Sequence, residues 1–232
     1  MFSAGPASWA PLHGRPQCAM SLKAMSHRPD HHDHVEQELS ELLYRIGAVR
    51  FGEFTLKDGR RSPFYLDLRV LVSHPDVLAR TARAMLQRAA GLRYDRLAGI
   101  PYAGMPLAVA MALVGERPMI YARKEVKDYG TRRSVEGEYR AGERALLIDD
   151  VVTSGGAKLE AIGPFREVGL VVEDVLVVVD REDRGAAVLA EAGLRLHSVL
   201  KVRALLGHLR ERDAASAGDV DRALDFLASA AR

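Results

Sequence analysis

Cysteine is nearly absent from this chain of 232 residues, which contains only Cys18. A single cysteine excludes an internal disulfide and a zinc site built from cysteines, and it favours the reducing cytoplasm as the location. Charge of one sign is also lacking: 33 Lys and Arg face 31 Asp and Glu, so the net charge of +2 gives no reason to expect a nucleic-acid partner. No apolar run approaches the roughly 20 residues that span a bilayer, so we expect no membrane insertion.

The first 34 residues lack the periodicity of the remainder. They carry Pro, Gly, Ser and His without a core pattern or an apolar signal segment, and we predict a disordered N-terminal extension over residues 1–34. Metal binding by a cluster of histidines near its end is a minor alternative to an incidental cluster (His27, His31, His32, His34). Met20 and Met25 leave open a later start of the protein.

Helical and strand patterns alternate from Val35 to the C-terminus, which predicts a single domain over residues 35–232. Helices are predicted at 35–47, 75–91, 104–115, 156–168, 185–193 and twice after residue 202, and strands at 96–101, 118–123, 144–149, 172–180 and 196–202. This order indicates an α/β fold with a mostly parallel sheet flanked by helices, in which ligands bind beyond the carboxyl ends of the strands. The last two helices are expected to pack on the rear of the sheet through their leucines (Leu205, Leu206, Leu209, Leu224, Leu227).

The stretch "ALLIDDVVTSGGA" at 145–157 combines carboxylates with small residues. An apolar run ends in Asp149 and Asp150 and then passes through Thr153, Ser154 and two glycines into a helical pattern. Backbone amides at a helix N-terminus favour a phosphate, and glycines let it approach closely. The carboxylates suit sugar hydroxyls or Mg²⁺ beside that phosphate, and a phosphorylated ribose satisfies both. The alternative is an acidic pair that caps a helix after a glycine-rich turn.

The stretch "FTLKDGRRSPFY" at 54–65 also has two interpretations. A flat aromatic substrate could stack on Phe64 and Tyr65 while Lys57 meets a negative group. The alternative is a hairpin that turns at Asp58-Gly59 and carries a surface lysine and two core aromatics, which the residues alone favour.

A cluster of five cations and the single Arg181 each have two interpretations. The cluster lies in residues 123–133 and could be a solvated face or a functional lid in a long connection between strands (Arg123, Lys124, Lys127, Arg132, Arg133). Arg181 follows a predicted strand, where it could bind a carboxylate of a ligand or form an ion pair with Asp180, Glu182 or Asp183.

Four stretches together resemble a known family. Residues 145–157 resemble the phosphoribosyl-pyrophosphate (PRPP) signature of type I phosphoribosyltransferases. Three others narrow the resemblance to orotate phosphoribosyltransferases: "FGEFTLKDGRRSPFYLDLR" at 51–69, "GIPYAGMPLA" at 99–108 and "YARKEVKDYGTRR" at 121–133. With "VVDRED" at 178–183, the resemblance runs in order from about Ile46 to Leu206.

The resemblance implies the type I phosphoribosyltransferase fold, with a small hood formed largely by the N-terminal region. It implies catalytic roles for three residues (Lys127, Asp149, Asp150). Contact with PRPP is implied for a larger set (Lys57, Tyr102, Ala103, Arg123, Lys124, Lys127, Tyr129, Asp149, Asp150, Val151, Val152, Thr153, Ser154, Gly155, Gly156, Ala157). Contact with orotate is implied for five residues (Lys57, Phe64, Tyr65, Thr153, Arg181).

The same resemblance implies transfer of ribose 5-phosphate from PRPP to orotate, giving orotidine 5′-monophosphate and pyrophosphate in pyrimidine biosynthesis. Mg²⁺ would be held through PRPP, without a direct protein ligand. Residues 123–138 would form a mobile catalytic loop that reaches the neighbouring subunit of a homodimer. Tyr129 and Ala103 depart from the His and Lys of the enterobacterial form and are similar to the transferase half of UMP synthases. Residue 232 leaves no room for a decarboxylase domain, which would be a separate protein.

Two other functions stay open at this point. A phosphoribosyltransferase for another base is disfavoured by Arg181, since a purine carries no carboxylate for it. A PRPP-sensing regulator would need a nucleic-acid-reading module, and the N-terminal segment has no pattern of one.

Overall fold

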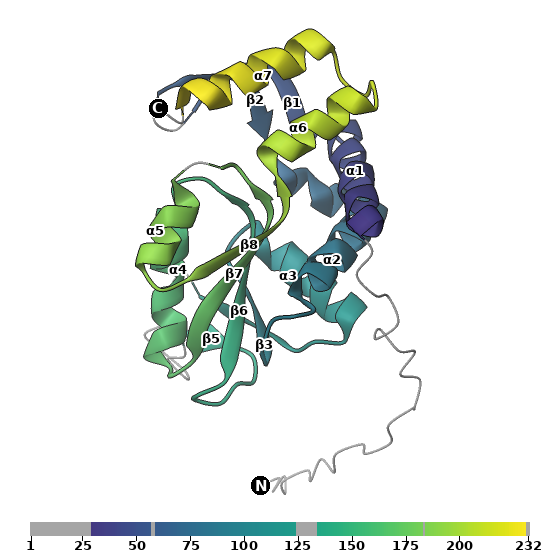
Figure 1. The fold of residues 1–232 in the computed structure, drawn as a ribbon. Helices are drawn as coiled ribbons and strands as arrows, with labels where there is room; N and C mark the ends of the chain where they lie inside the picture. Colours follow the sequence, from purple (N-terminus) through teal and green to yellow (C-terminus); the bar gives the residue numbers. More distant parts are fainter. Residues whose placement is uncertain (1–28, 57–58, 124–133, 183, 231–232) are drawn as a thin grey trace, which may run out of the picture.

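The computed structural model describes residues 29–56, 59–123, 134–182 and 184–230 (Figure 1). Its central sheet has six strands in the order β5-β4-β3-β6-β7-β8. Five of them run parallel: β3 (Arg96–Gly99), β4 (Met119–Ala122), β6 (Arg144–Val152), β7 (Val171–Asp180) and β8 (Arg195–Lys201). The short β5 (Val135–Glu136) pairs antiparallel with β4 at one edge. The predicted mostly parallel sheet is therefore confirmed.

Helices cover both faces of this sheet (Figure 1). One face carries α2 (Pro75–Ala89) and α3 (Gly104–Gly115), and the other carries α4 (Gly156–Glu167) and α5 (Gly185–Glu191). Successive residues of β6 feed the two cores alternately, since Leu146 and Ile148 pack with α2 and α3, whereas Leu147 packs with α4. A strand buried on both faces needs an almost continuous apolar run, and β6 supplies one until Asp149.

A second layer, which we call the hood, stands above the carboxyl ends of the strands (Figure 1). It contains α1 (Pro29–Arg45), the antiparallel hairpin of β1 (Val49–Thr55) and β2 (Arg61–Leu66), α6 (Val202–Glu211) and α7 (Ala217–Ala230). The 3-10 helix η2 (Leu68–Ser73) leads from the hood back to α2. The predicted hairpin is confirmed, with Phe64 in the core; Tyr65 is partly exposed, and Lys57 and Asp58 of its turn lie outside the described residues.

The C-terminal helices correct one expectation. They do not cover the rear of the sheet but complete the hood, where α6 packs on α1 and α7 packs on β2. The ring of Phe226 meets Phe64 edge-on at 6.3 Å, and Ser40 of α1 lies 3.1 Å from the His208 ring nitrogen of α6. An amphipathic pattern fixes which face of a helix is buried but not which apolar surface covers it, so the leucines alone did not identify the partner.

Three boundaries also differ from the prediction. The first helix begins at Pro29, so residues 29–34 are helical rather than part of the extension; proline is favoured at the first helical position because its missing N–H needs no partner there. Residues 1–28 lie outside the described residues. Strand β6 continues to Val152, and β5 occupies part of the segment predicted as a loop. Among the helices of the described ranges, none combines the length and apolar character needed to cross a membrane.

Candidate active site at the carboxyl edge of the sheet

The candidate site lies where β6 ends, between its neighbours β3 and β7. Asp149 and Asp150 are the sixth and seventh residues of β6, and a turn at Thr153–Gly155 leads directly into α4. Asp149 is buried and Asp150 is half-buried. The stretch that carries the PRPP signature therefore occupies the edge of the sheet at which α/β proteins bind ligands.

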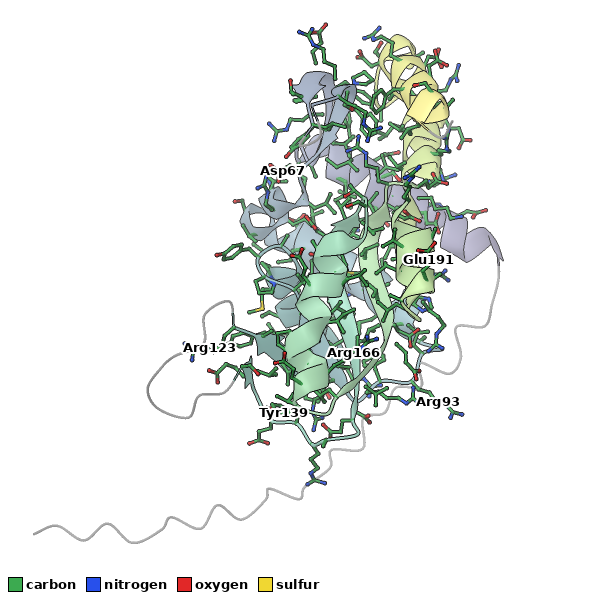
Figure 2. All side chains as sticks on the ribbon, turned by 90° about the vertical axis from the view of Figure 1, so that its left-hand side faces the viewer. Asp67, Arg93, Arg123, Tyr139, Arg166 and Glu191 are labelled. Carbon is green, nitrogen blue, oxygen red and sulfur yellow. The ribbon has the colours of Figure 1, made fainter. Side chains whose placement is uncertain are left out.

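The two carboxylates have different surroundings because adjacent residues of a strand point to opposite faces. Asp149 lies on the α4 face, where its Oδ2 is 2.8 Å from Nζ of Lys158. Asp150 lies on the face toward η2, where Arg69 is held by a 2.7 Å hydrogen bond from its Nε to Asp67 Oδ1. That hydrogen bond first, and then the charges of Asp67 and Asp150, raise the pKa of Arg69. Figure 2 shows Asp67 where the hood meets the sheet.

Backbone amides hold both carboxylates in place. The N–H of Asp150 donates to Asp149 Oδ1 at 2.9 Å, and the N–H of Val151 donates to Asp150 Oδ1 at 2.7 Å. Burial, and then repulsion from the Asp149 carboxylate, raise the pKa of Asp150 to about 6. The site therefore holds one carboxylate in an ion pair and a second one that is easily protonated, which is the kind of perturbed pair found where charge develops in a reaction.

The turn before α4 has the geometry of a phosphate loop. Thr153 and Ser154 are exposed, and Gly155 has φ +81°, a conformation that side chains rarely adopt. No side chain of the described residues caps α4, so its first N–H groups face the turn with the positive end of the helix dipole. A phosphate bound there would supply the missing acceptors.

A glycine of α5 packs closely against this turn. A Cβ added to Gly185 would lie 2.4 Å from the carbonyl oxygen of Thr153 and 2.6 Å from Cγ2 of Val152. Gly104, at the start of α3, is equally tight, since its Cβ would lie 2.1 Å from the Ile148 carbonyl oxygen. The ends of β6 and of the turn are therefore fixed by backbone-to-backbone packing on both faces of the sheet.

Arg181 follows β7 and sits between the sheet and the hood. Its N–H donates to the Val152 carbonyl at 3.1 Å, and its guanidinium lies 5.1 Å above the ring of Phe64. Glu182, one of the acids considered as a partner for Arg181, accepts a hydrogen bond from the N–H of Arg203 at 3.0 Å. Asp183 lies outside the described residues. The structure thus brings Arg181 and Phe64, far apart in the sequence, to the same place.

The two predicted orotate aromatics differ in exposure. Phe64 is completely buried, so its ring is a core side chain between Arg181 and Phe226. Tyr65 is partly exposed and stacks on Phe54 at 5.4 Å between ring centroids. Of the pair, Tyr65 alone presents ring surface to a ligand in this conformation.

Two further predicted segments border the site. Tyr102, 73% exposed, and Ala103 lie in the turn after β3, next to the end of β6. Arg123 follows β4, and its Nη1 lies 3.0 Å from Glu136 Oε1 of β5, at the base of the loop (Figure 2). Four predicted cations and aromatics lie outside the described residues (Lys57, Lys124, Lys127, Tyr129), as do Arg132 and Arg133.

The described residues provide no ready-made metal site. Within the described ranges, no three His, Cys, Asp or Glu residues gather in a way that could hold an ion. Lys158 and the N–H of Asp150 each occupy one oxygen of Asp149. Of the N-terminal histidines, His27 lies outside the described residues, and the side chains of His31 and His32 are not described.

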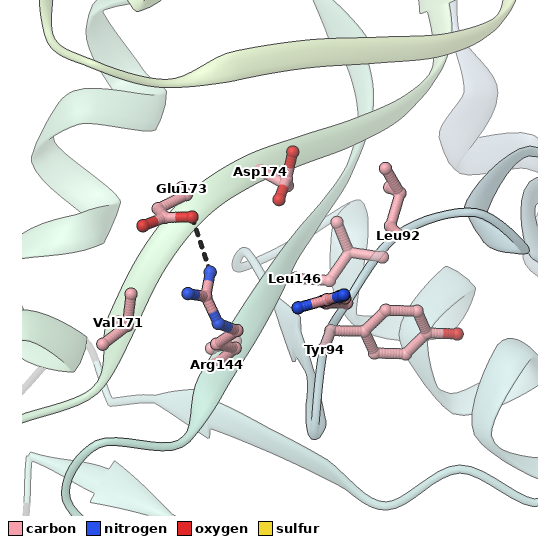
Figure 3. Close-up of a pocket in the computed structure, with 9 residues that line it drawn as sticks. Leu92, Tyr94, Arg144, Leu146, Val171, Glu173 and Asp174 are labelled. Carbon is pink, nitrogen blue, oxygen red and sulfur yellow. Dashed lines mark hydrogen bonds and ion pairs between the residues drawn. The ribbon is translucent and has the colours of Figure 1, made fainter.

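A pocket at the opposite edge of the sheet has a different character (Figure 3). It is lined by the first residues of β6 and β7, and Arg144 there lies 2.6 Å from Glu173 Oε2. Arg195 donates to both oxygens of the buried Asp174 at 2.8 Å, and His197 lies 2.8 Å from Asp174 Oδ1. These acids are engaged by neighbouring cations, so we assign the cluster to stability rather than to ligand binding.

The sequence interpretation missed three residues of the candidate site. Lys158 was not among the predicted site residues, although a lysine in the first turn of a helix after two acids is itself a signal. Arg69 stands in "YLDLR", directly after the predicted aromatics. Gly185 carries no signal in one sequence, since its role depends on packing against a turn more than 30 residues away.

Comparison with known proteins agrees with this geometry. No family model matches the chain. It is 40% identical over 176 residues to the orotate phosphoribosyltransferase of Caenorhabditis elegans, which covers 75% of this chain and 78% of that protein. It is also 40% identical over 187 residues to the uridine 5'-monophosphate synthase of Bos taurus, covering 80% of this chain and 39% of that protein. The chain therefore spans about two fifths of this longer relative.

Solved structures lead to the same family. The UMP synthase of Leishmania donovani superimposes with a TM-score of 0.77 at 36% identity, covering 84% of this chain and 42% of that one. The orotate phosphoribosyltransferase of Mycobacterium tuberculosis in complex with PRPP superimposes with a TM-score of 0.62 at 32% identity, covering 74% and 98%. The predicted type I phosphoribosyltransferase fold is confirmed. With its fold, its motifs and its full-length relatives in agreement, the chain belongs to the orotate phosphoribosyltransferase family.

Proposed function

We propose that this chain transfers the ribose 5-phosphate unit of PRPP to orotate and releases pyrophosphate. The observation that carries this proposal is the position of three features at one edge of the sheet: the acid pair of β6, the phosphate loop before α4, and Arg181 at the end of β7. These features match the three chemical parts of the reaction, which are a sugar, a phosphate and a carboxylate. The relative solved with PRPP supports the donor.

The acid pair and the loop would hold the ribose 5-phosphate. Residues 153–157 would bind the 5′-phosphate through backbone amides and the Thr153 and Ser154 hydroxyls. Asp149 and Asp150 would accept hydrogen bonds from the ribose hydroxyls, with Val151 and Val152 alongside. When the bond between the anomeric carbon and pyrophosphate breaks, its electron pair leaves with pyrophosphate and the sugar becomes positively charged, as in glycoside hydrolysis. Asp150 is placed to stabilise that charge.

Orotate recognition would rest on the cation at the end of β7. A guanidinium binds a carboxylate with two parallel hydrogen bonds, and Arg181 is kept in place by Phe64 beneath it. Thr153 would assist, Tyr65 would lie against the ring of orotate, and Lys57 would approach from the turn of the hairpin. The new bond joins the ring nitrogen of orotate to the anomeric carbon as the old bond breaks, and the proton of that nitrogen passes to an oxygen of the departing pyrophosphate.

The pyrophosphate side would be covered by the segment between β4 and β5. Lys124 and Lys127 would neutralise the departing pyrophosphate, Lys127 being the catalytic one, with Arg123, Tyr102, Ala103 and Tyr129 around them. When bound through PRPP, Mg²⁺ supplies further positive charge to the leaving group. Closing the loop would also keep water from the sugar cation.

A homodimer is supported by an apolar face that is exposed among the described residues, and the sharing of the loop between subunits rests on the resemblance alone. On α3, Leu113 is 77% exposed, with Val109 and Val114 beside it, and Tyr121 of the adjoining β4 is also exposed. Monomeric proteins rarely expose such contiguous apolar surface, so a second copy is the proposed cover. With its lone cysteine, the enzyme would work in the cytoplasm, and a decarboxylase would consume the product.

Base specificity tests this proposal. Purified protein is mixed with PRPP, Mg²⁺ and one of four bases: orotate, uracil, adenine or hypoxanthine. We expect turnover of orotate alone. In Arg181→Met, orotate turnover should fall by about one to two orders of magnitude, since a charge-assisted pair is worth roughly 1.5–3 kcal/mol, while PRPP binding stays unchanged. Preferred turnover of a purine would contradict the substrate, and PRPP binding without turnover of any base would indicate a sensor.

A further inference from the structure

Lys158 is a buried cation for which the reaction described above gives no role. It lies in the first turn of α4, only 7% of the residue is exposed, and its flexible four-carbon stem is enclosed beside the core of that face. A lysine is almost never buried without a partner, because removing its charge from water is costly. Its partners are therefore the reason for its position.

Both partners belong to the end of β6. Nζ of Lys158 lies 2.8 Å from Asp149 Oδ2 and donates to the Val151 carbonyl at 2.5 Å. One side chain thus joins the first turn of α4 to the strand on the other side of the phosphate loop. The loop from Val152 to Ala157 is closed at its base by these two bonds, in addition to the peptide chain itself.

We propose that Lys158 is a positioning residue that sets the shape of the phosphate loop and neutralises Asp149 before PRPP binds. This inference rests on the proposed function, because it concerns the same PRPP site. Two carboxylates beside a phosphate loop would repel a polyanionic substrate. The lysine cancels the charge of Asp149, whereas Asp150, on the opposite face of the strand toward Arg69, is the carboxylate that Lys158 does not bind.

The arrangement also explains how Asp149 keeps one orientation. Its Oδ2 is held by Lys158 and its Oδ1 by the N–H of Asp150, so the carboxylate is fixed from both ends. The charge of Lys158 also lowers the pKa of Asp150, against the larger effects of burial and of Asp149 that raise it. Arg69 on η2 is a further charged group near Asp150, and Asp180 of β7 pairs in register with Val152, two residues further along β6. Loss of Lys158 should therefore disturb both acids.

The test compares Lys158→Met, which keeps the length but removes the charge, with Lys158→Arg. Lys201→Met is the matched control, since Lys201 is the other lysine in the described ranges and is exposed. PRPP affinity is measured without orotate by calorimetry, and KM and kcat are measured separately across pH. In Lys158→Met we expect PRPP affinity to fall about tenfold to a hundredfold, the orotate KM to stay within about twofold, and the acid limb of the pH profile to move to higher pH. Lys158→Arg should recover part of the affinity, and Lys201→Met should behave as wild type.

A double-mutant cycle separates this role from general damage to the fold. If the lysine acts through Asp149, Lys158→Met should cost less than about threefold in PRPP affinity when introduced into Asp149→Asn. An equal loss in both backgrounds, or unchanged or tighter PRPP binding in Lys158→Met alone, would overturn the inference while wild-type turnover of orotate stands. A wild-type chain that does not bind PRPP would overturn both the inference and the proposed function.

Discussion

Gly185→Ala tests whether packing beneath the phosphate loop sets the affinity for PRPP. The added Cβ would lie 2.4 Å from the Thr153 carbonyl oxygen, whereas ordinary contacts begin at 3.4 Å, so the loop or α5 must move by about 1 Å. Overpacking of this kind costs about 1–3 kcal/mol. A displacement of about 1 Å in a binding loop can cost roughly a hundredfold in rate. We therefore expect both a lower melting temperature and a PRPP KM raised by about tenfold to a hundredfold.

The matched control is Gly207→Ala on α6, where an added Cβ meets nothing within 4 Å. The same chemical change there should stabilise the protein by about 0.5–1 kcal/mol, because glycine weakens a helix interior. Thermal unfolding and initial rates at varied PRPP, with orotate saturating, distinguish the two variants. A Gly185→Ala protein with wild-type melting temperature and wild-type PRPP KM would refute the idea that α5 supports the loop.

Three further predictions follow from the charges and the packing. Because the folded-state pKa of Asp150 is about 6 and thus above its ordinary 3.8, ionisation of Asp150 destabilises the fold at neutral pH. Asp150→Asn should therefore raise the melting temperature at pH 7–8, with the gain vanishing below about pH 4, while orotate turnover is lost. Phe226→Ala should lower the free energy of unfolding, measured with denaturant, by about 2 kcal/mol. It should also raise the orotate KM, since Phe226 packs against Phe64; an unchanged KM would contradict a link between packing in the hood and orotate binding. Arg195→Met should lower the free energy of unfolding at pH 7 by leaving buried Asp174 short of a partner, with both KM values unchanged. This loss of stability should shrink below the usual pKa of the Asp174 carboxyl, because Arg195 lowers that pKa in the folded protein.

The regular part of the fold could be predicted because its pattern is local. An apolar run predicts strand β6, and α3 was predicted with its observed bounds, 104–115. The antiparallel β5 was not predicted, because two residues carry no periodicity. The place of α6 and α7 was predicted wrongly, since their apolar faces fit the sheet and the hood equally well until the hairpin supplies Phe64 as a partner.

The site was predictable where it is continuous in the sequence and unpredictable where it is assembled from distant elements. The acid pair and the glycine turn stand together in "LLIDDVVTSGG", so their meeting needed only a strand followed by a helix. The contact of Arg181 with Phe64 joins β7 to the hairpin, and the positions of these two residues in the sequence do not predict it. The opposite orientation of Asp149 and Asp150 follows from the alternation of side chains along a strand. The contact of Lys158 with Asp149 could not be predicted, because it depends on how α4 packs against β6.

The most direct test of the proposed function is the stoichiometry of the reaction. Orotate, PRPP and Mg²⁺ are incubated with the purified wild-type chain and with Lys127→Ala, and orotate, orotidine 5′-monophosphate and pyrophosphate are quantified together. We expect one nucleotide and one pyrophosphate for each orotate consumed by the wild type, and turnover at least about a hundredfold lower in the variant. Pyrophosphate release without nucleotide formation, or no consumption of orotate at all, would contradict the proposed function.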